Sequence, residues 1–184
     1  MADNLDYLNE KIEQFAIEKL TSVYNSIYND FIWNQKADDF DFVHQELGIA
    51  LEVSLVITKN TQNVVSYQNS FRKDITTIKQ AKVDDTGRLL SWYGGSVGEL
   101  RRMIIERINR KNTKAKKHIR EGIAECQLCL CIDDGGWFEK ESEFAFLKSI
   151  KLSKDVMFRK IFIITMSLFL VYEDDEIVRY TRNA

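Results

Sequence analysis

The chain has 184 residues, of which 26 are basic and 28 acidic, 45% are hydrophobic, three are cysteine and none is proline. This composition excludes collagen-like, disulfide-stapled and disordered proteins, because the apolar content is sufficient for one ordinary core. The length and the lack of a Gly/Ser/Pro-rich linker predict a single domain over residues 1–184.

The formal net charge of −2 conceals an uneven distribution along the chain. Residues 101–120 carry nine basic side chains and one acid, Glu106, which gives +8 there, whereas the remaining 17 basic and 27 acidic residues give −10. A local field of this size attracts polyphosphates even to an acidic protein, so the segment is a candidate nucleic-acid surface. An ordinary solvated helix face is the alternative explanation of such a basic run.

The N-terminal half alternates between helical and strand patterns. Apolar residues at steps of three and four predict a helix over residues 5–30. The alternation in residues 39–42 and the β-rich run of residues 48–57 predict two strands joined by a short turn. A weaker apolar stripe indicates a helix over residues 61–82, and the glycines of residues 84–95 indicate a loop.

The C-terminal half begins with a capping-box sequence, Ser96 to Glu99, which predicts a long basic helix ending near Glu125. An apolar strand at residues 126–132, a helix over residues 139–150 and a strand at residues 161–165 then form a crossover unit with parallel pairing. Two further strands, 168–172 and 177–180, flank an acidic turn and predict a hairpin. The expected class is α/β, an α/β/α sandwich with a mixed central sheet.

A lone carboxylate, Glu52, interrupts the apolar strand at residues 48–57, where an unpaired buried charge would be costly. In the predicted hairpin, one turn position places Asp41 opposite Glu52, and a shift of the turn places Asp39 there instead. Either arrangement brings acidic side chains together on one face, where they repel unless a cation lies between them. Mg²⁺, or Mn²⁺ in its place, is the expected cofactor, because it takes one or two protein carboxylates and leaves positions for phosphate oxygens.

The order of these elements resembles that of the restriction-endonuclease-like nucleases of the PD-(D/E)XK superfamily. The likeness includes a leading helix, a hairpin that carries an Asp and then an acid, a basic helix and the apolar strand LCLCI. It implies a magnesium-dependent endonuclease that hydrolyses phosphodiester bonds in DNA, with RNA as the alternative substrate. It also implies that Asp41, or Asp39, and Glu52 bind the metal.

The sequence departs from the family pattern at two positions. Phe40 precedes Asp41 where the family has Pro, and Ser54 stands two residues after Glu52 where the family has a catalytic Lys. Some members of the superfamily place this lysine on a neighbouring helix, which makes Lys111 the candidate here. Some also take a metal ligand from the first helix, where Glu13 borders the apolar stripe.

Four basic side chains of the long helix are the candidate contacts with the nucleic-acid backbone: Arg107, Arg110, Lys114 and Lys117. A non-catalytic module of the same fold, which binds nucleic acid or protein, is the alternative function, and Ser54 favours it. A homodimer formed through the first helix is a further expectation.

The remaining signals indicate structure and location. The cysteines at 126, 129 and 131 lack a second pair at zinc-ligand spacing and are expected to be buried core residues. The apolar stretch of residues 161–172 is shorter than the roughly 20 residues of a membrane-spanning helix. The reduced cysteines and the lack of a signal-peptide pattern predict a cytoplasmic protein with no membrane partner.

Overall fold

The structure is a computed structural model of residues 1–184. It divides the chain into two compact units, one formed by Met1–Val56 and Ile104–Ala184 and the other by Ile57–Met103. The single-domain prediction stays a prediction. The residues that the structure describes are 3–34, 39–58, 61–63, 82–83, 85, 89–91, 97–119, 122–132, 145, 150, 155–165, 168–174 and 176–180.

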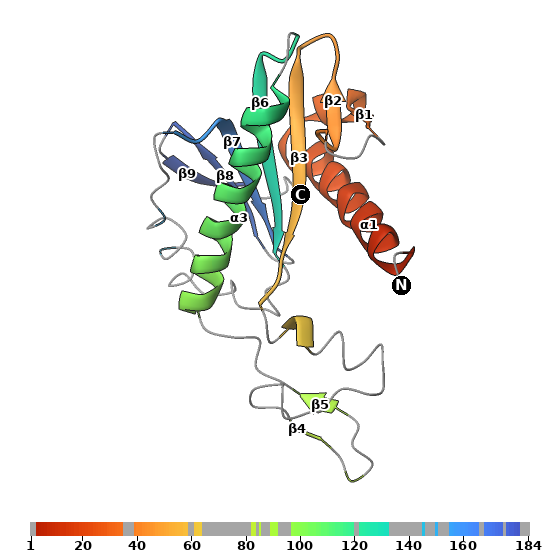
Figure 1. The fold of residues 1–184 in the computed structure, drawn as a ribbon, viewed down its shortest axis with the longest axis vertical. Helices are drawn as coiled ribbons and strands as arrows, with labels where there is room; N and C mark the ends of the chain where they lie inside the picture. The colour runs from red at the N-terminus through yellow and green to blue at the C-terminus, as the bar shows by residue number, and fades with distance from the viewer. Residues whose placement is uncertain are drawn as a thin grey trace. The chain divides into compact units, whose positions relative to one another are not determined.

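A seven-stranded mixed sheet, in the order β1-β2-β3-β6-β7-β8-β9, forms the centre of the first unit (Figure 1). The β3-β6 and β6-β7 pairs are parallel and the other four pairs are antiparallel, so the predicted parallel pairing and both predicted hairpins are confirmed. The first hairpin strand is displaced from its predicted position at residues 39–42, because β2 covers Phe42–His44. The α/β class with a mixed central sheet is therefore confirmed as well. The strands are β1 Ile32–Trp33, β2 Phe42–His44, β3 Ile49–Val56, β6 Glu125–Ile132, β7 Phe158–Ile164, β8 Phe169–Glu173 and β9 Glu176–Tyr180.

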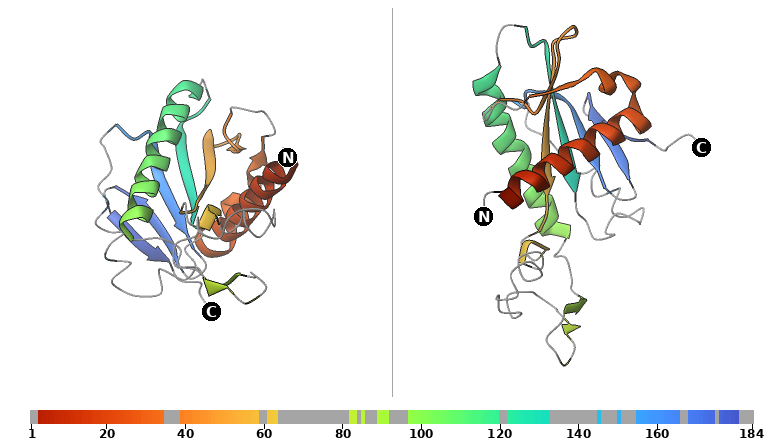
Figure 2. Two further views of the ribbon diagram at one scale, coloured as in Figure 1. Left: turned by 60° about the horizontal axis from the view of Figure 1, so that its bottom comes forward. Right: turned by 90° about the vertical axis from the view of Figure 1, so that its right-hand side faces the viewer.

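Two long helices, α1 Asp3–Lys19 and α3 Val97–His118, lie on opposite faces of this sheet (Figure 2). Ala16 of α1 packs in a core with alternate strand residues such as Val53 and Phe162. On the other face, Ile104 and Ile108 of α3 are buried. Strand residues therefore face α1 or α3 in turn, as the two-residue period of a β-strand requires.

The first helix is shorter than the sequence predicts. After α1 the chain continues as a π-helical turn, η1 Leu20–Tyr24, and then as a 3₁₀ turn, η2 Ser26–Asp30. Asn25 breaks the run because its backbone is extended and its side chain accepts a hydrogen bond from the N–H of Ile27. The long basic helix also ends early, at His118, because Gly122 turns the chain and Glu125 already pairs in the sheet.

Gly48 ends the turn between β2 and β3 with a φ of +62°, which favours glycine. Its carbonyl accepts hydrogen bonds from the N–H groups of Ala124, at 2.7 Å, and Glu125, at 3.2 Å. A Cβ atom at position 48 would lie 2.4 Å from the carbonyl oxygen of Gly122. The turn thus holds the hairpin and the start of β6 together.

The second unit contains a small antiparallel sheet of β4 Lys82–Val83 and β5 Leu89–Ser91. The prediction of a loop over residues 84–95 was therefore wrong for β5, whose three residues are too few to show a period. Most of the helix predicted over residues 61–82, and all of that over residues 139–150 except positions 145 and 150, lie outside the described residues.

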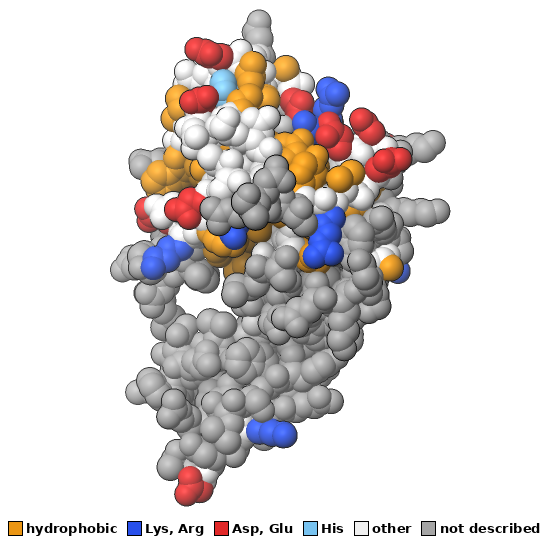
Figure 3. All heavy atoms as spheres, turned by 180° about the vertical axis from the view of Figure 1, so that it is seen from behind, with side chains coloured by type: hydrophobic (Ala, Val, Ile, Leu, Met, Phe, Trp, Pro, Cys, Tyr) orange, Lys and Arg blue, Asp and Glu red, His pale blue; other side chains and the backbone are white. Residues whose placement is uncertain are grey.

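The cysteines, the surface side chains and the helices can be compared with what the sequence predicts. Cys126, Cys129 and Cys131 are free and buried, which confirms the prediction of core cysteines. Hydrophobic side chains lie among acidic ones on the face shown in Figure 3, which is opposite to the view of Figure 1. Within the described ranges, no helix has both the length and the apolar character needed to cross a membrane.

Candidate functional site

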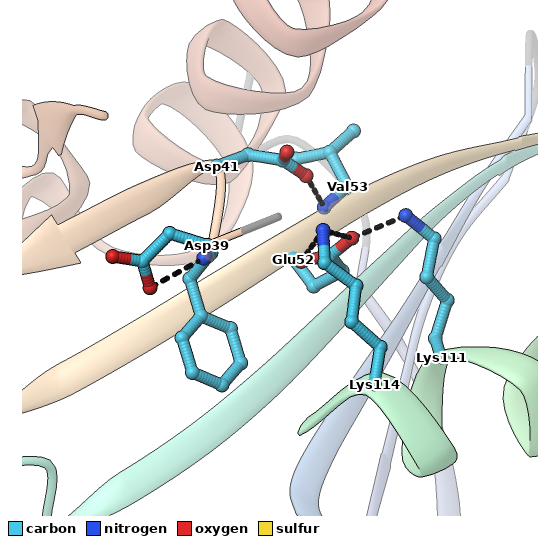
Figure 4. Close-up of polar contacts among 7 residues, drawn as sticks. Asp39, Asp41, Glu52, Val53, Lys111 and Lys114 are labelled. Atoms are coloured by element: carbon cyan, nitrogen blue, oxygen red, sulfur yellow. Dashed lines mark hydrogen bonds and ion pairs between the residues drawn. The ribbon is translucent and has the colours of Figure 1, made fainter. Parts of the chain in front are cut away.

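Asp41 lies directly before β2, at the position opposite Glu52. The pairs Phe42–Leu51 and Val43–Ala50 set this register, which is the first of the two predicted ones. The Oδ2 atom of Asp41 accepts a hydrogen bond from the Val53 N–H at 2.6 Å (Figure 4). This carboxylate therefore occupies the place that a strand carbonyl would take if β2 continued.

Glu52 is buried in the middle of β3, with 1% of its surface exposed. Lys111 donates a hydrogen bond to its Oε1 atom, and the ammonium of Lys114 lies 3.1 Å from Oε1 and 3.4 Å from Oε2. Figure 4 shows both lysines reaching from α3 to this one carboxylate. A buried charge needs such partners, so the two lysines explain how Glu52 is tolerated in an apolar strand.

Glu13 brings a third carboxylate into this electrostatic group. Its Oε2 atom accepts a hydrogen bond from the indole N–H of Trp33 at 2.8 Å. Burial raises the pKa of Glu13, and the charge of Glu52 raises it further, while the Trp33 hydrogen bond and the charge of Lys111 lower it. Glu13 therefore feels the charges of both Glu52 and Lys111.

The pKa of Asp41 is raised from its ordinary value of 3.8 to about 7. Burial is the main cause, and the charges of Glu52 and Glu13 add to it. The hydrogen bond from Val53 and the charge of Lys111 act in the opposite direction. The site is thus a crowded group of carboxylates that favours either a proton or another cation near Asp41.

This raised pKa predicts how stability varies with pH. The unfolded chain ionises Asp41 near pH 3.8 and the folded chain only near pH 7, so the folded state binds more protons in between. The contribution of Asp41 to stability is therefore complete below about pH 4 and is lost as the pH rises through about 7. Asp41→Asn should remove this loss, and urea unfolding of both proteins between pH 4 and pH 8 would measure it. If the difference in unfolding free energy between wild type and Asp41→Asn does not change with pH, the raised pKa of Asp41 is contradicted.

Asp39 does not join this group. Its Oδ1 atom accepts a hydrogen bond from the Phe40 N–H at 2.9 Å, and its carboxylate is directed away from Glu52 in Figure 4. The shifted register that would have placed Asp39 opposite Glu52 is absent, because the pairing of β2 with β3 places Asp41 there.

The four basic residues proposed for nucleic-acid contact fall into two groups. Arg110 and Lys117 are exposed on α3, and Arg107 is half-buried, where burial and the charge of Arg110 lower its pKa. Lys114 instead contacts Glu52. The sequence could have shown this, since Lys114 is three positions from Lys111 and so lies on the same side of the helix.

The donor chemistry of the site fits a hard divalent cation, because the three carboxylates of Glu13, Asp41 and Glu52 supply oxygen ligands. Among the residues that the structure describes, no set of three or more His, Cys, Asp and Glu is arranged to hold a metal ion directly. Both oxygens of Glu52 already have lysine partners. A cation at Glu52 would thus take over a role that ammonium groups now fill.

Comparisons with known proteins give no further guide to this site: no family model, no curated protein and no solved structure matches the chain.

Proposed function

We propose that the protein is a metal-dependent phosphodiesterase of the PD-(D/E)XK type that cleaves DNA. The observation that carries the proposal is the meeting of Asp41, Glu52 and Lys111, with Glu13 inside the same electrostatic field. These residues come from separate elements and are those that the family resemblance selects. A purely structural role would not require four charged groups to gather beside a buried strand.

The arrangement of elements supports the restriction-endonuclease-like fold as part of this proposal. The hairpin of β2 and β3 leads into the parallel pair of β3 and β6, and the basic helix α3 lies between them in the chain. Helices on opposite faces of the sheet complete the three layers (Figure 2).

Asp41 and Glu52 would hold Mg²⁺ or Mn²⁺, and Glu13, whose charge raises the pKa of Asp41, would be the further candidate ligand. The bound ion supplies Lewis-acid stabilisation of the scissile phosphate and activates a water nucleophile. Lys111 is the group that would stabilise the negative charge developing on the phosphate oxygens. Without a bound metal ion, Lys111 and Lys114 neutralise the charge of Glu52 in the buried strand.

The substrate would lie along α3. Arg110 and Lys117 are exposed on α3 and Arg107 is half-buried. These side chains can contact backbone phosphates without reading sequence. Such contacts suit both DNA, the proposed substrate, and RNA, the alternative, and the same assay compares the two.

The test is cleavage of plasmid DNA and of a matched RNA with Mg²⁺ or Mn²⁺. Asp41→Asn and Glu52→Gln should each lower the cleavage rate by about 100-fold or more, because each removes a charged ligand. Glu46→Gln, a change of an exposed carboxylate in the hairpin turn, is the matched control and should leave the rate unchanged. Circular dichroism of each variant separates lost chemistry from lost folding. If Asp41→Asn and Glu52→Gln are both folded and both cleave at the wild-type rate, the proposal is refuted.

A non-catalytic binding module is the second candidate function. It is favoured by Ser54, which stands where the family motif has its lysine, and by the pairing of both Glu52 oxygens with ammonium groups. Nucleic-acid binding by α3 without cleavage in either metal would select this function.

A further inference from the structure

A groove lies between one side of α1 and the start of the hairpin, with a volume of about 320 Å³. Its helical wall comes from positions 10, 13, 14, 17 and 18, a spacing that places side chains along one side of a helix. Its lining is both apolar and acidic: the apolar part is Ile17, Trp33 and Phe42, and the acidic part is Glu10, Glu13 and Glu18.

Trp33 is the most exposed apolar part of this lining. Its side chain is held by the hydrogen bond to Glu13, yet the residue is 43% exposed, and its neighbour Ile32 is 54% exposed. Both belong to β1, the end strand of the seven-stranded sheet. These consecutive side chains point to opposite faces of the strand, and Trp33, opposite Phe42, is the one that lines the groove. A large apolar side chain exposed on an end strand is typical of an interaction surface.

The charges of the groove indicate what kind of partner fits it. In the part of the chain that the structure describes, neither Glu10 nor Glu18 forms an ion pair. Carboxylates around an exposed indole attract ammonium and guanidinium groups, which also bind favourably over an aromatic face. Without a bound cation, Glu10 and Glu18 repel phosphate, so a nucleic-acid strand fits this part of the groove poorly.

We propose that this groove binds a short basic segment of a partner protein, in which an apolar side chain contacts Trp33 and flanking Lys or Arg side chains pair with Glu10 and Glu18. The basic helix α3 and the acidic groove on α1 then give the protein two surfaces of opposite charge preference. Peptide binding needs no metal, so its success or failure is independent of the proposed phosphodiesterase activity.

The test is fluorescence anisotropy of a labelled hexapeptide, Arg-Arg-Leu-Ile-Arg-Arg, in EDTA, with a peptide bearing Glu at the four Arg positions as control. Glu10→Gln with Glu18→Gln should weaken binding of the basic peptide by about 10-fold or more, as should Trp33→Ala. Glu46→Gln with Glu176→Gln removes the same charge from exposed sites elsewhere and should change affinity by less than about twofold. Circular dichroism confirms that each variant is folded.

Four results would overturn the proposal. Equal weakening by the groove pair and by the control pair would show attraction to net charge alone. Wild-type dimers in sedimentation that Trp33→Ala converts to monomers would show that a second copy fills the groove. No saturable peptide binding, or a loss of single-stranded DNA binding in Trp33→Ala without a loss of peptide binding, would likewise remove the basic segment as its occupant.

Discussion

Lys111→Ala is expected to lower metal-dependent DNA cleavage by about 100- to 1,000-fold, which is the usual cost of losing one group that stabilises transition-state charge. The lysine already contacts the buried Glu52, and its charge lowers the pKa of Asp41 and of Glu13. The variant should still bind DNA, because Arg107, Arg110 and Lys117 are unchanged. Cleavage rates at saturating DNA would therefore report the chemical step rather than binding.

Lys116→Ala is the matched control, because this exposed lysine lies on the same helix and its loss changes the net charge equally. Its cleavage rate should stay within about threefold of wild type, since exposed charge pairs contribute little.

A relocation experiment tests the role of Lys111 more sharply. Ser54 lies two residues after Glu52 in β3, so both side chains are on the same face of the strand. Adding Ser54→Lys to Lys111→Ala would return an ammonium group to the position where the family motif carries it. We expect this double variant to recover cleavage at least about 10-fold above Lys111→Ala. Lys111 would have no catalytic role if Lys111→Ala cleaves DNA at the wild-type rate and the folded double variant cleaves it no faster.

The site was partly predictable because its main features depend on local geometry. The short turn of the hairpin allowed only two registers, and both gave Glu52 an acidic neighbour. The family resemblance then selected Lys111 on the long helix, and this lysine contacts Glu52 in the structure. The contact of Lys114 with Glu52 was missed although its three-residue spacing from Lys111 indicated it. The contact of Trp33 with Glu13 depends on how α1 lies against the sheet, which no period in the sequence reveals.

The fold departs from the sequence prediction where a single residue outweighs the pattern. Asn25 ends the first helical run although the apolar spacing continues past it. Gly122 and the pairing of Glu125 with Ile49 end the basic helix early, because a strand partner satisfies the backbone there. Hydrophobic period predicts which face of an element is buried, but capping and pairing decide where the element ends.

Gly48→Ala is expected to destabilise the protein by about 2–4 kcal/mol, more than most single substitutions outside a core. Two effects add together at this position. The φ of +62° strains a residue that has a Cβ atom, and that atom would lie 2.4 Å from the carbonyl oxygen of Gly122. The midpoint of urea unfolding at pH 7, compared with wild type, would measure the loss.

Gly122→Ala is a control that separates these two effects. Gly122 also has a positive φ, of +93°, but a Cβ atom there would meet nothing within 4 Å. Its substitution should therefore cost only the backbone strain, about 1 kcal/mol. Equal destabilisation by the two variants would show that the contact between the hairpin turn and the chain before β6 adds no strain. A larger loss of unfolding free energy in Gly48→Ala than in Gly122→Ala would show that the contact adds strain. If Asp41→Asn also lowers the cleavage rate less in the Gly48→Ala protein than in wild type, the turn sets the register that pairs Asp41 with Glu52.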